Sequence, residues 1–390
     1  MRKGFTTGSC AAAASKAAAY MLLSGTVKNK IEITTPAGII YSPDIEDITR
    51  GENFVKCAVR KDAGDDPDVT GGSLVYAKVS FPEGGSGPDD VRSEHAVMDK
   101  LTENDECRVR ISGGEGVGTV TRPGLDQPVG NAAINSVPRK MIREEVMQVM
   151  ELLDHGGSLD VEISVPGGEE IALKTFNPRL GIEGGISIIG TTGIVEPMST
   201  RALLDTIRVE LNQLKEMGAP VAVVSPGNYG LDFMKDTYGF DLDRAVKCSN
   251  YIGDTIDMAC EIGFDKMLLC GHIGKLVKVS GGIMNTHSRE GDCRMELMAA
   301  AAVRCGADKD SLNRILDCVA TEEAIDILEK ENIRNECFEY ITDKISFYLN
   351  KRGAGRIKVE CMIYANAYGL LGKTAEAETF LEEAKREIKA

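Results

Sequence analysis

The chain lacks the cysteine spacings that mark a metal site or a disulfide framework. Its eleven cysteines are spread over 390 residues, and no two of them stand in a C-x-x-C spacing or beside a histidine in a zinc-like pattern. We therefore expect no protein-bound metal. Free thiols also favour a reducing, cytoplasmic compartment.

Long apolar runs and an excess of positive charge are missing as well. Lys16 interrupts the short apolar tract near the N-terminus, so this tract is not typical of a signal peptide, and no run approaches the roughly 20 residues that span a bilayer. The formal net charge of −15 argues against a nucleic-acid or anionic-membrane partner, because both favour clustered lysine and arginine. With 43% hydrophobic and 27% charged residues, a chain of this length predicts a globular protein of two domains.

The most distinctive stretch that is present is a hydroxyl-rich turn leading into an alanine-rich helix, residues 4–25. Thr6, Thr7 and Ser9 are N-cap types, and Gly25 is typical of a helix end. Residues 10–19 carry little side-chain bulk, so another backbone or a ligand can approach closely. Two interpretations stay open: a tightly packed structural helix, or a helix whose N-terminus receives a carboxylate or phosphate.

The first 178 residues predict an α+β domain. Six segments show period-2 patterning or β-branched enrichment, and a second helix is expected after Pro138. The helix dipole favours acidic residues in the first turn, yet this turn carries the basic residues Arg139 and Lys140. An anion bound beside them would explain their presence. The glycine- and proline-rich loop before this helix contains Arg122 and is long enough to line a site.

An acidic loop, residues 61–72, carries Asp62, Asp65, Asp66 and Asp68. One interpretation is a solvated turn, because aspartate is an ordinary turn residue. The other is a carboxylate cluster that holds a cation or acts as a base. The loop lacks the glycine and glutamate spacing of an EF-hand, which disfavours calcium.

The second half predicts an α/β domain with a parallel, Rossmann-like sheet over residues 179–365, followed by a C-terminal amphipathic helix in 366–390. Three short apolar runs, residues 186–189, 221–225 and 266–270, each end in a glycine-containing loop and precede helical sequence. Ligands bind outside the carboxyl ends of such strands. The candidate cofactor-binding residues are therefore Gly190, Thr191, Thr192, Gly193, Ser225, Gly227, Asn228 and Gly271. His272 is either a satisfied structural histidine or a contact to the ligand.

Several motifs in the same order resemble the cobalt-precorrin-5B C(1)-methyltransferase family of anaerobic cobalamin (vitamin B12) biosynthesis. They are GFTTGSCAAAASKAA, AGDDPDVT, GVGTVTRPGL, AIN-x-VPRKMI, IIGTTGIVEPMS, SPGNYG and GHIGKLVKVSGGIMNTHS. The resemblance covers residues 4 to about 365. It implies that S-adenosylmethionine methylates ring carbon 1 of cobalt-precorrin-5B to give cobalt-precorrin-6A.

The resemblance also suggests roles for the residues noted above. The substrate would be a large, flat tetrapyrrole fringed with carboxylates, and its cobalt arrives inside the macrocycle. The candidate partners for those carboxylates are Thr6, Thr7, Ser9, Arg122, Arg139 and Lys140. If the reaction requires a proton to be added or removed, the catalytic candidates are Asp65, Asp66 and His272.

Two other classes of function are compatible with the same loops. Glycine loops after parallel strands also serve NAD-type oxidoreductases, although a clear G-x-G-x-x-G followed by an acidic residue about 20 positions later is absent. A non-catalytic tetrapyrrole or cobalt carrier is the third class. Binding of S-adenosylmethionine separates the three, because only a methyltransferase requires it. The sequence leaves a homo-oligomer open.

Overall fold

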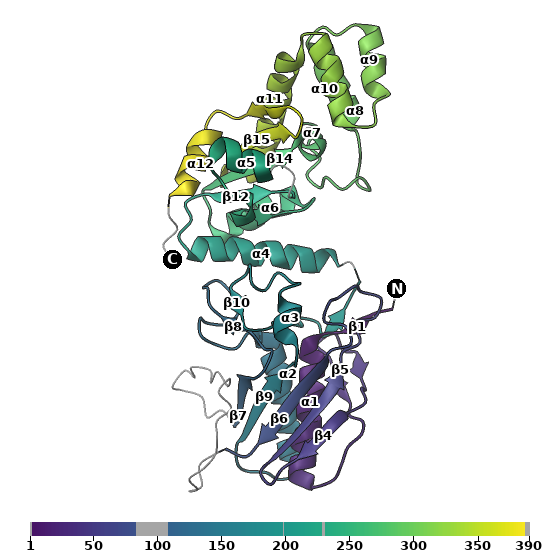
Figure 1. Ribbon diagram of the computed structural model, residues 1–390, viewed down its shortest axis with the longest axis vertical. Helices are drawn as coiled ribbons and strands as arrows, with labels where there is room; N and C mark the ends of the chain where they lie inside the picture. The colour runs from purple at the N-terminus through teal and green to yellow at the C-terminus, as the bar shows by residue number, and fades with distance from the viewer. Residues whose placement is uncertain (1, 83–107, 198, 228–230, 387–390) are drawn as a thin grey trace. The chain divides into compact units, whose positions relative to one another are not determined.

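A computed structural model describes residues 2–82, 108–197, 199–227 and 231–386. The chain divides into two compact units, Met1–Ser199 and Thr200–Ala390 (Figure 1). Residues 179–199, which the sequence analysis assigned to the second domain, belong to the first unit. None of the helices in the described ranges is long and apolar enough to cross a membrane.

The first unit is built on a mixed five-stranded sheet with the order β4-β5-β6-β9-β7. Neighbouring strands are antiparallel except β7 and β9, which are parallel. The strands are β4 (Glu46–Arg50), β5 (Phe54–Arg60), β6 (Leu74–Ser80), β7 (Val109–Gly113) and β9 (Leu159–Ser164). Three two-stranded pairs accompany it: β1 (Gly4–Phe5) with β11 (Ile194–Val195), β2 (Ile33–Thr34) with β3 (Ile40–Tyr41), and β8 (Thr119–Val120) with β10 (Ile182–Glu183).

The alanine-rich helix α1 (Thr7–Ser24) packs against β5, β6 and the helix α2 (Ser136–Leu152). Seven of its alanines, residues 11–14 and 17–19, are fully buried. Their small side chains allow the helix backbone to approach the sheet closely, and the Cys57 thiol of β5 donates to the Ala14 carbonyl at 3.3 Å. The helix ends at Gly25 with a φ of +76°, as the sequence predicts. A short helix, α3 (Gly168–Ala172), follows β9.

The second unit contains a five-stranded sheet with the order β13-β12-β14-β15-β16, parallel except at β16. The strands are β12 (Ala222–Ser225), β13 (Val246–Lys247), β14 (Lys266–His272), β15 (Lys358–Ala365) and β16 (Gly369–Lys373). The predicted strands at 221–225 and 266–270 are confirmed. β16 and the helix α12 (Ala377–Lys385) show that residues 366–390 form part of this unit, not a separate helix alone.

Helices cover both faces of this sheet. One face packs against α4 (Thr200–Glu216), α6 (Ile252–Ile262), α7 (Ile273–Val279) and the long helix α11 (Arg334–Gly353). The other face packs against α5 (Leu231–Tyr238), the 3₁₀ turn η1 (Leu242–Arg244) and α12. Between α7 and α11 the chain adds α8 (Arg294–Arg304), α9 (Lys309–Leu316) and α10 (Thr321–Lys330).

The apolar run at 186–189 is not a strand of this sheet, which corrects the sequence-based expectation. Ile186 and Ile188 form isolated bridges to Val117 and Ile134 in the first unit. Both side chains are buried in the first core. A short apolar run shows that a segment is buried, but its length does not show which core it enters.

Candidate functional site

The clearest candidate site lies at the carboxyl ends of β12 and β14 in the second unit. β12 comes first in the sequence, and the next two strands, β13 and β14, lie on opposite sides of it in the sheet. This reversal of strand order is a topological switch point, where doubly wound sheets bind their ligands. The structure therefore brings Ser225 and Gly227 of one loop beside Gly271 and His272 of the next. Asn228 lies outside the described residues.

Lys275 of α7 fastens two of the switch-point loops. Its Nζ donates to the Pro226 carbonyl at 2.9 Å and to the Ser249 carbonyl at 3.3 Å. Pro226 follows β12 and Ser249 follows β13, so one ammonium group joins the loops of two neighbouring strands. Burial lowers the pKa of Lys275. The place of Lys275 at the start of the helix after β14 follows from the sequence, but its two loop partners do not.

Ser225 shapes the loop after β12. Its buried hydroxyl donates to the Gly227 carbonyl at 2.7 Å, closing a tight turn. It also bonds with the hydroxyl of Tyr364, at the end of β15; burial raises the pKa of Tyr364, and the bond with Ser225 opposes that shift. The Tyr364 ring lies 5.6 Å from Phe233 and 6.1 Å from His272, measured between ring centroids.

His272 is the N-cap of α7. Its Nδ1 accepts the Gly274 backbone N–H at 3.1 Å, and its Nε2 lies 3.1 Å from Glu322 Oε1. A ring that accepts at Nδ1 carries its proton on Nε2 when neutral, which faces the carboxylate. Burial lowers the pKa of His272, while Glu322 acts in the opposite direction. The geometry therefore gives both ring nitrogens a structural partner.

This arrangement predicts a pH dependence of stability in the second unit. Because the pKa of folded His272 is lowered, its contribution is fully present above the unfolded value of about 6.5 and is lost as pH falls from there toward the folded pKa. A His272→Asn variant keeps a capping acceptor without the titration. Urea midpoints at pH 8 and 5.5 should therefore differ more in the wild type than in the variant. Equal differences would exclude His272 as the titrating group.

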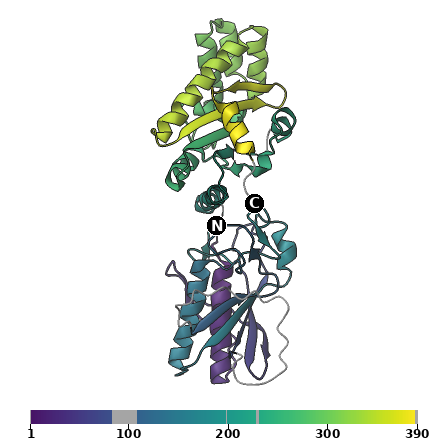
Figure 2. The same ribbon diagram turned by 90° about the vertical axis from the view of Figure 1, so that its left-hand side faces the viewer.

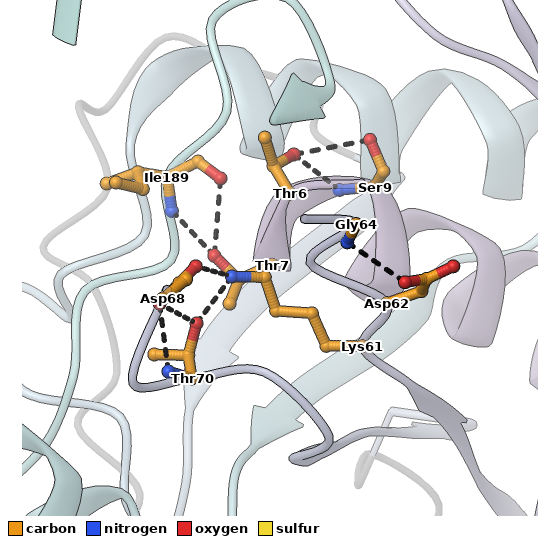
Figure 3. Close-up of polar contacts among 9 residues, drawn as sticks. All are labelled: Thr6, Thr7, Ser9, Lys61, Asp62, Gly64, Asp68, Thr70 and Ile189. Atoms are coloured by element: carbon orange, nitrogen blue, oxygen red, sulfur yellow. Dashed lines mark hydrogen bonds and ion pairs between the residues drawn. The ribbon is translucent and has the colours of Figure 1, made fainter. Parts of the chain in front are cut away.

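In the first unit, the N-terminal turn of α1 packs against the loop of residues 189–193 (Figure 3). The Gly8 N–H donates to the Ile189 carbonyl at 3.0 Å, and the Thr6 N–H donates to the Gly193 carbonyl at 3.1 Å. The Ser9 N–H bonds to the Thr6 hydroxyl at 3.2 Å, and the Ser9 hydroxyl bonds to the Gly193 carbonyl at 2.7 Å. These amides thus bind acceptors of the protein itself, which favours the structural interpretation of the helix start.

Glycine is required where this loop meets the turn. A Cβ on Gly190 would lie 2.3 Å from Thr6 Oγ1, and one on Gly193 would lie 2.8 Å from Ser9 Oγ. Gly193 also has a φ of +78°. Close packing therefore explains why both positions are glycine. The start of α1 and the loop of residues 190–193, which the sequence analysis placed in different domains, belong to the same unit.

The acidic loop is held by basic groups. Asp62 pairs with Arg2, and Asp65 accepts the Arg2 backbone N–H at 2.6 Å. Asp68 pairs with Lys61, whose side chain is only 3% exposed and also bonds to Thr70 (Figure 3). No cluster of three or more candidate metal ligands occurs among the described residues.

The basic candidates of the first unit differ in their surroundings. The guanidinium of Arg139 donates to the carbonyls of Ile134 at 2.7 Å, Ala132 at 3.2 Å and Ile111 at 3.3 Å. Arg122 is exposed and donates to the Arg179 carbonyl at 3.2 Å. Lys140 is exposed, with its Nζ 3.7 Å from Glu144 Oε1. Arg122 and Lys140 therefore have charged groups at the surface, whereas Arg139 fastens backbone segments.

The fold is that of a two-unit mixed α/β protein, with a mixed sheet in the first unit and a mostly parallel five-stranded sheet in the second. The chain belongs to the CbiD family: the family model matches residues 1–197, and the model of the CbiD C-terminal domain matches residues 285–375. The first match ends close to the end of the first unit.

Curated relatives cover nearly the whole chain. A protein of Ruminiclostridium cellulolyticum is 46% identical over 366 residues, 94% of this chain and 89% of that protein. One of Thermoanaerobacter sp. is 44% identical over 378 residues, 96% of each. Both are named cobalt-precorrin-5B C(1)-methyltransferase. A crystal structure of a cobalamin biosynthesis protein (cbiD) from Archaeoglobus fulgidus shares 26% identity with a TM-score of 0.38, covering 74% of this chain and 84% of that one.

Proposed function

We propose that this protein uses S-adenosylmethionine to methylate ring carbon 1 of cobalt-precorrin-5B, giving cobalt-precorrin-6A in cobalamin biosynthesis. The observation that carries the proposal is the identity of 44–46% to relatives of that name over more than nine-tenths of the chain. The two family models match segments of both units, so the relationship to the family is not confined to one of them.

The cofactor is assigned to the carboxyl edge of the second-unit sheet, which is Rossmann-like in its strand order. Ser225, Gly227 and Gly271 stand at this edge. The space beside Gly227 is open, because no described atom lies within 4 Å of the position of an added Cβ. Lys275 supplies a cationic donor for the carboxylate of the methionine part. The residues present therefore fit the group.

The first unit is assigned to the substrate. Arg122 and Lys140 offer exposed cations to the carboxylate fringe of the tetrapyrrole. Four other candidates have polar groups that already bond to backbone or side-chain atoms, so on this proposal they stabilise the loops that carry the cations and do not contact the substrate. They are Thr6, Thr7, Ser9 and Arg139. On this proposal, the loop of Gly190, Thr191, Thr192 and Gly193 holds the start of α1 in place.

The bound cofactor supplies an electrophilic methyl group, which the electron pair of ring carbon 1 attacks while the carbon–sulfur pair leaves with sulfur. The protein's task is to hold the two carbons in line and to exclude water, so alignment provides most of the acceleration. Asp65 is exposed and Asp66 half-buried, and on this proposal one of these two carboxylates accepts a proton if the reaction releases one. His272 is less suited to acid–base work, because both of its nitrogens face protein groups.

Turnover with methyl-labelled S-adenosylmethionine tests the proposal. Purified protein incubated with cobalt-precorrin-5B should add one methyl group by mass, with the label on ring carbon 1 by NMR. Binding of the tetrapyrrole without methyl transfer would indicate a carrier instead. Calorimetric binding of NAD in place of S-adenosylmethionine would indicate an oxidoreductase.

A Lys275→Met variant tests the placement of the cofactor. Loss of the bonds to Pro226 and Ser249 should loosen both loops and raise the dissociation constant of S-adenosylhomocysteine about tenfold, or about 1.4 kcal/mol. Lys266→Met is the matched control: it removes a lysine from the amino end of β14, where its partner is Glu383. Calorimetry should show little change in the control. An equal loss in both variants would contradict a site at the carboxyl edge.

A further inference from the structure

The helices α8–α10, drawn in green in Figure 2, form an insertion between α7 and α11. One of them, α10, presents two carboxylates to the carboxyl edge of the sheet. Glu322 and Asp326 are four residues apart, so they lie one turn apart on the same side of the helix. Each is in contact with a residue at the end of a strand or in the turn that follows one.

The first contact joins Glu322 to His272 at the end of β14, with Oε1 and Nε2 3.1 Å apart. Glu322 is itself positioned by Thr321, whose hydroxyl donates to Oε2 at 2.9 Å. The second contact joins Asp326 to the hydroxyl of Tyr368, in the turn between β15 and β16. The bond to Asp326 raises the pKa of Tyr368 to about 12, so this phenol stays protonated as a donor at neutral pH.

We propose that Glu322 and Asp326 are positioning residues for the cofactor edge, which they hold through His272 and Tyr368. This inference rests on the proposed function for the identity of the ligand. The insertion thereby becomes a support of the cofactor site rather than an independent module.

Glu322 acts on the loop of residues 271–274 by favouring one tautomer of His272. The ring caps α7 only while Nδ1 is unprotonated, and it then carries its proton on Nε2. The Glu322 carboxylate favours that tautomer, because it offers an acceptor to the Nε2 proton. Without the carboxylate, the proton can move to Nδ1, and the bond to the Gly274 N–H is lost. The loop from Gly271 to Gly274 would then lose its cap at the cofactor edge.

The test compares Glu322→Ala and Asp326→Ala with Glu329→Ala, because alanine removes the acceptor oxygen that glutamine or asparagine would keep. The control removes a carboxylate from the same helix: Glu329 forms its ion pair with Arg334, at 2.9 Å, and not with His272 or Tyr368. The side-chain ¹⁵N signals of His272 report its tautomer. They can be assigned by comparison with His272→Asn, because the chain has four histidines.

Glu322→Ala should shift the His272 ¹⁵N signals away from a pure Nε2–H form. It should also raise the dissociation constant of S-adenosylhomocysteine about threefold to tenfold. Asp326→Ala should raise that constant without changing the tautomer, and Glu329→Ala should change neither. Unchanged tautomer and affinity in Glu322→Ala would overturn the inference, and so would an equal effect of the control.

Failure of the proposed function would appear differently. If the wild type does not bind S-adenosylhomocysteine, the ligand assignment is wrong. The tautomer and the hydrogen exchange of the Gly271–Gly274 amides then decide whether Glu322 positions the loop. Faster exchange in Glu322→Ala alone supports it, and unchanged exchange overturns it.

Discussion

Replacing Gly193 by alanine should lower the free energy of unfolding of the first unit by about 3 kcal/mol. Two effects add at this position. The backbone has a φ of +78°, which is unfavourable for residues with a side chain, and the new methyl group would lie 2.8 Å from both Ser9 Oγ and Thr35 Cβ. Relief of the clash requires the loop to move away from α1, which breaks the bonds from Thr6 and Ser9 to the Gly193 carbonyl. Urea unfolding measures the loss.

Gly38→Ala is the control for this prediction. Gly38 has a similar φ of +74°, but no described atom lies within 4 Å of its added Cβ. Its substitution should lower the free energy of unfolding by about 1 kcal/mol, because only the unfavourable backbone conformation contributes. If the two variants lose the same stability, the close approach between the loop and α1 contributes nothing. A Gly193→Ala protein that is stable but no longer binds cofactor would favour a direct cofactor contact at this loop instead.

The sequence predicted the elements whose signals are local. The helix from Thr7 to Ser24 follows from its N-cap residue, its alanines and Gly25, all of which act within a few residues. The strands ending at Ser225 and His272 follow from apolar runs that stop at glycine loops. The switch point between them did not follow from the sequence, because it depends on the place of β13 in the sheet, and the sequence analysis did not predict this two-residue strand.

The sequence did not predict partners that are distant in the chain. The run 186–189 has the composition of a core strand, yet it enters the first core, because Ile186 and Ile188 meet Val117 and Ile134 there. The roles of two charged residues near the candidate cofactor edge were missed for the same reason. Lys275 and Glu322 are common surface types, and only their partners, about 50 residues away, give them a role. Lys275 had one local signal, its position in the helix after a glycine loop.

Asp68→Asn should destabilise the first unit by about 3 kcal/mol at pH 7, because it leaves the ammonium of Lys61 buried without its counter-charge. The Lys61 side chain is 3% exposed and that of Asp68 is 23% exposed, so water replaces the lost partner poorly. Asp62→Asn is the control, since its pair with Arg2 is exposed on both sides and water screens it, so its loss should change the stability far less. A double variant, Lys61→Met with Asp68→Asn, should recover part of the loss, because it removes both charges together.

The pH dependence distinguishes loss of this ion pair from a packing defect. Burial alone would raise the pKa of the Asp68 carboxyl, but the Lys61 charge and the bonds from Lys61 and Thr70 outweigh it and lower that pKa below its ordinary value. A lowered folded pKa contributes stability that is present above the unfolded value of about 3.9 and is lost as pH falls through the folded pKa. The difference in unfolding free energy between wild type and Asp68→Asn should therefore be constant from pH 5 to 8 and shrink below about pH 4. A difference that persists unchanged into acid would mean that the asparagine perturbs packing, and that Lys61 does not depend on the charge of Asp68.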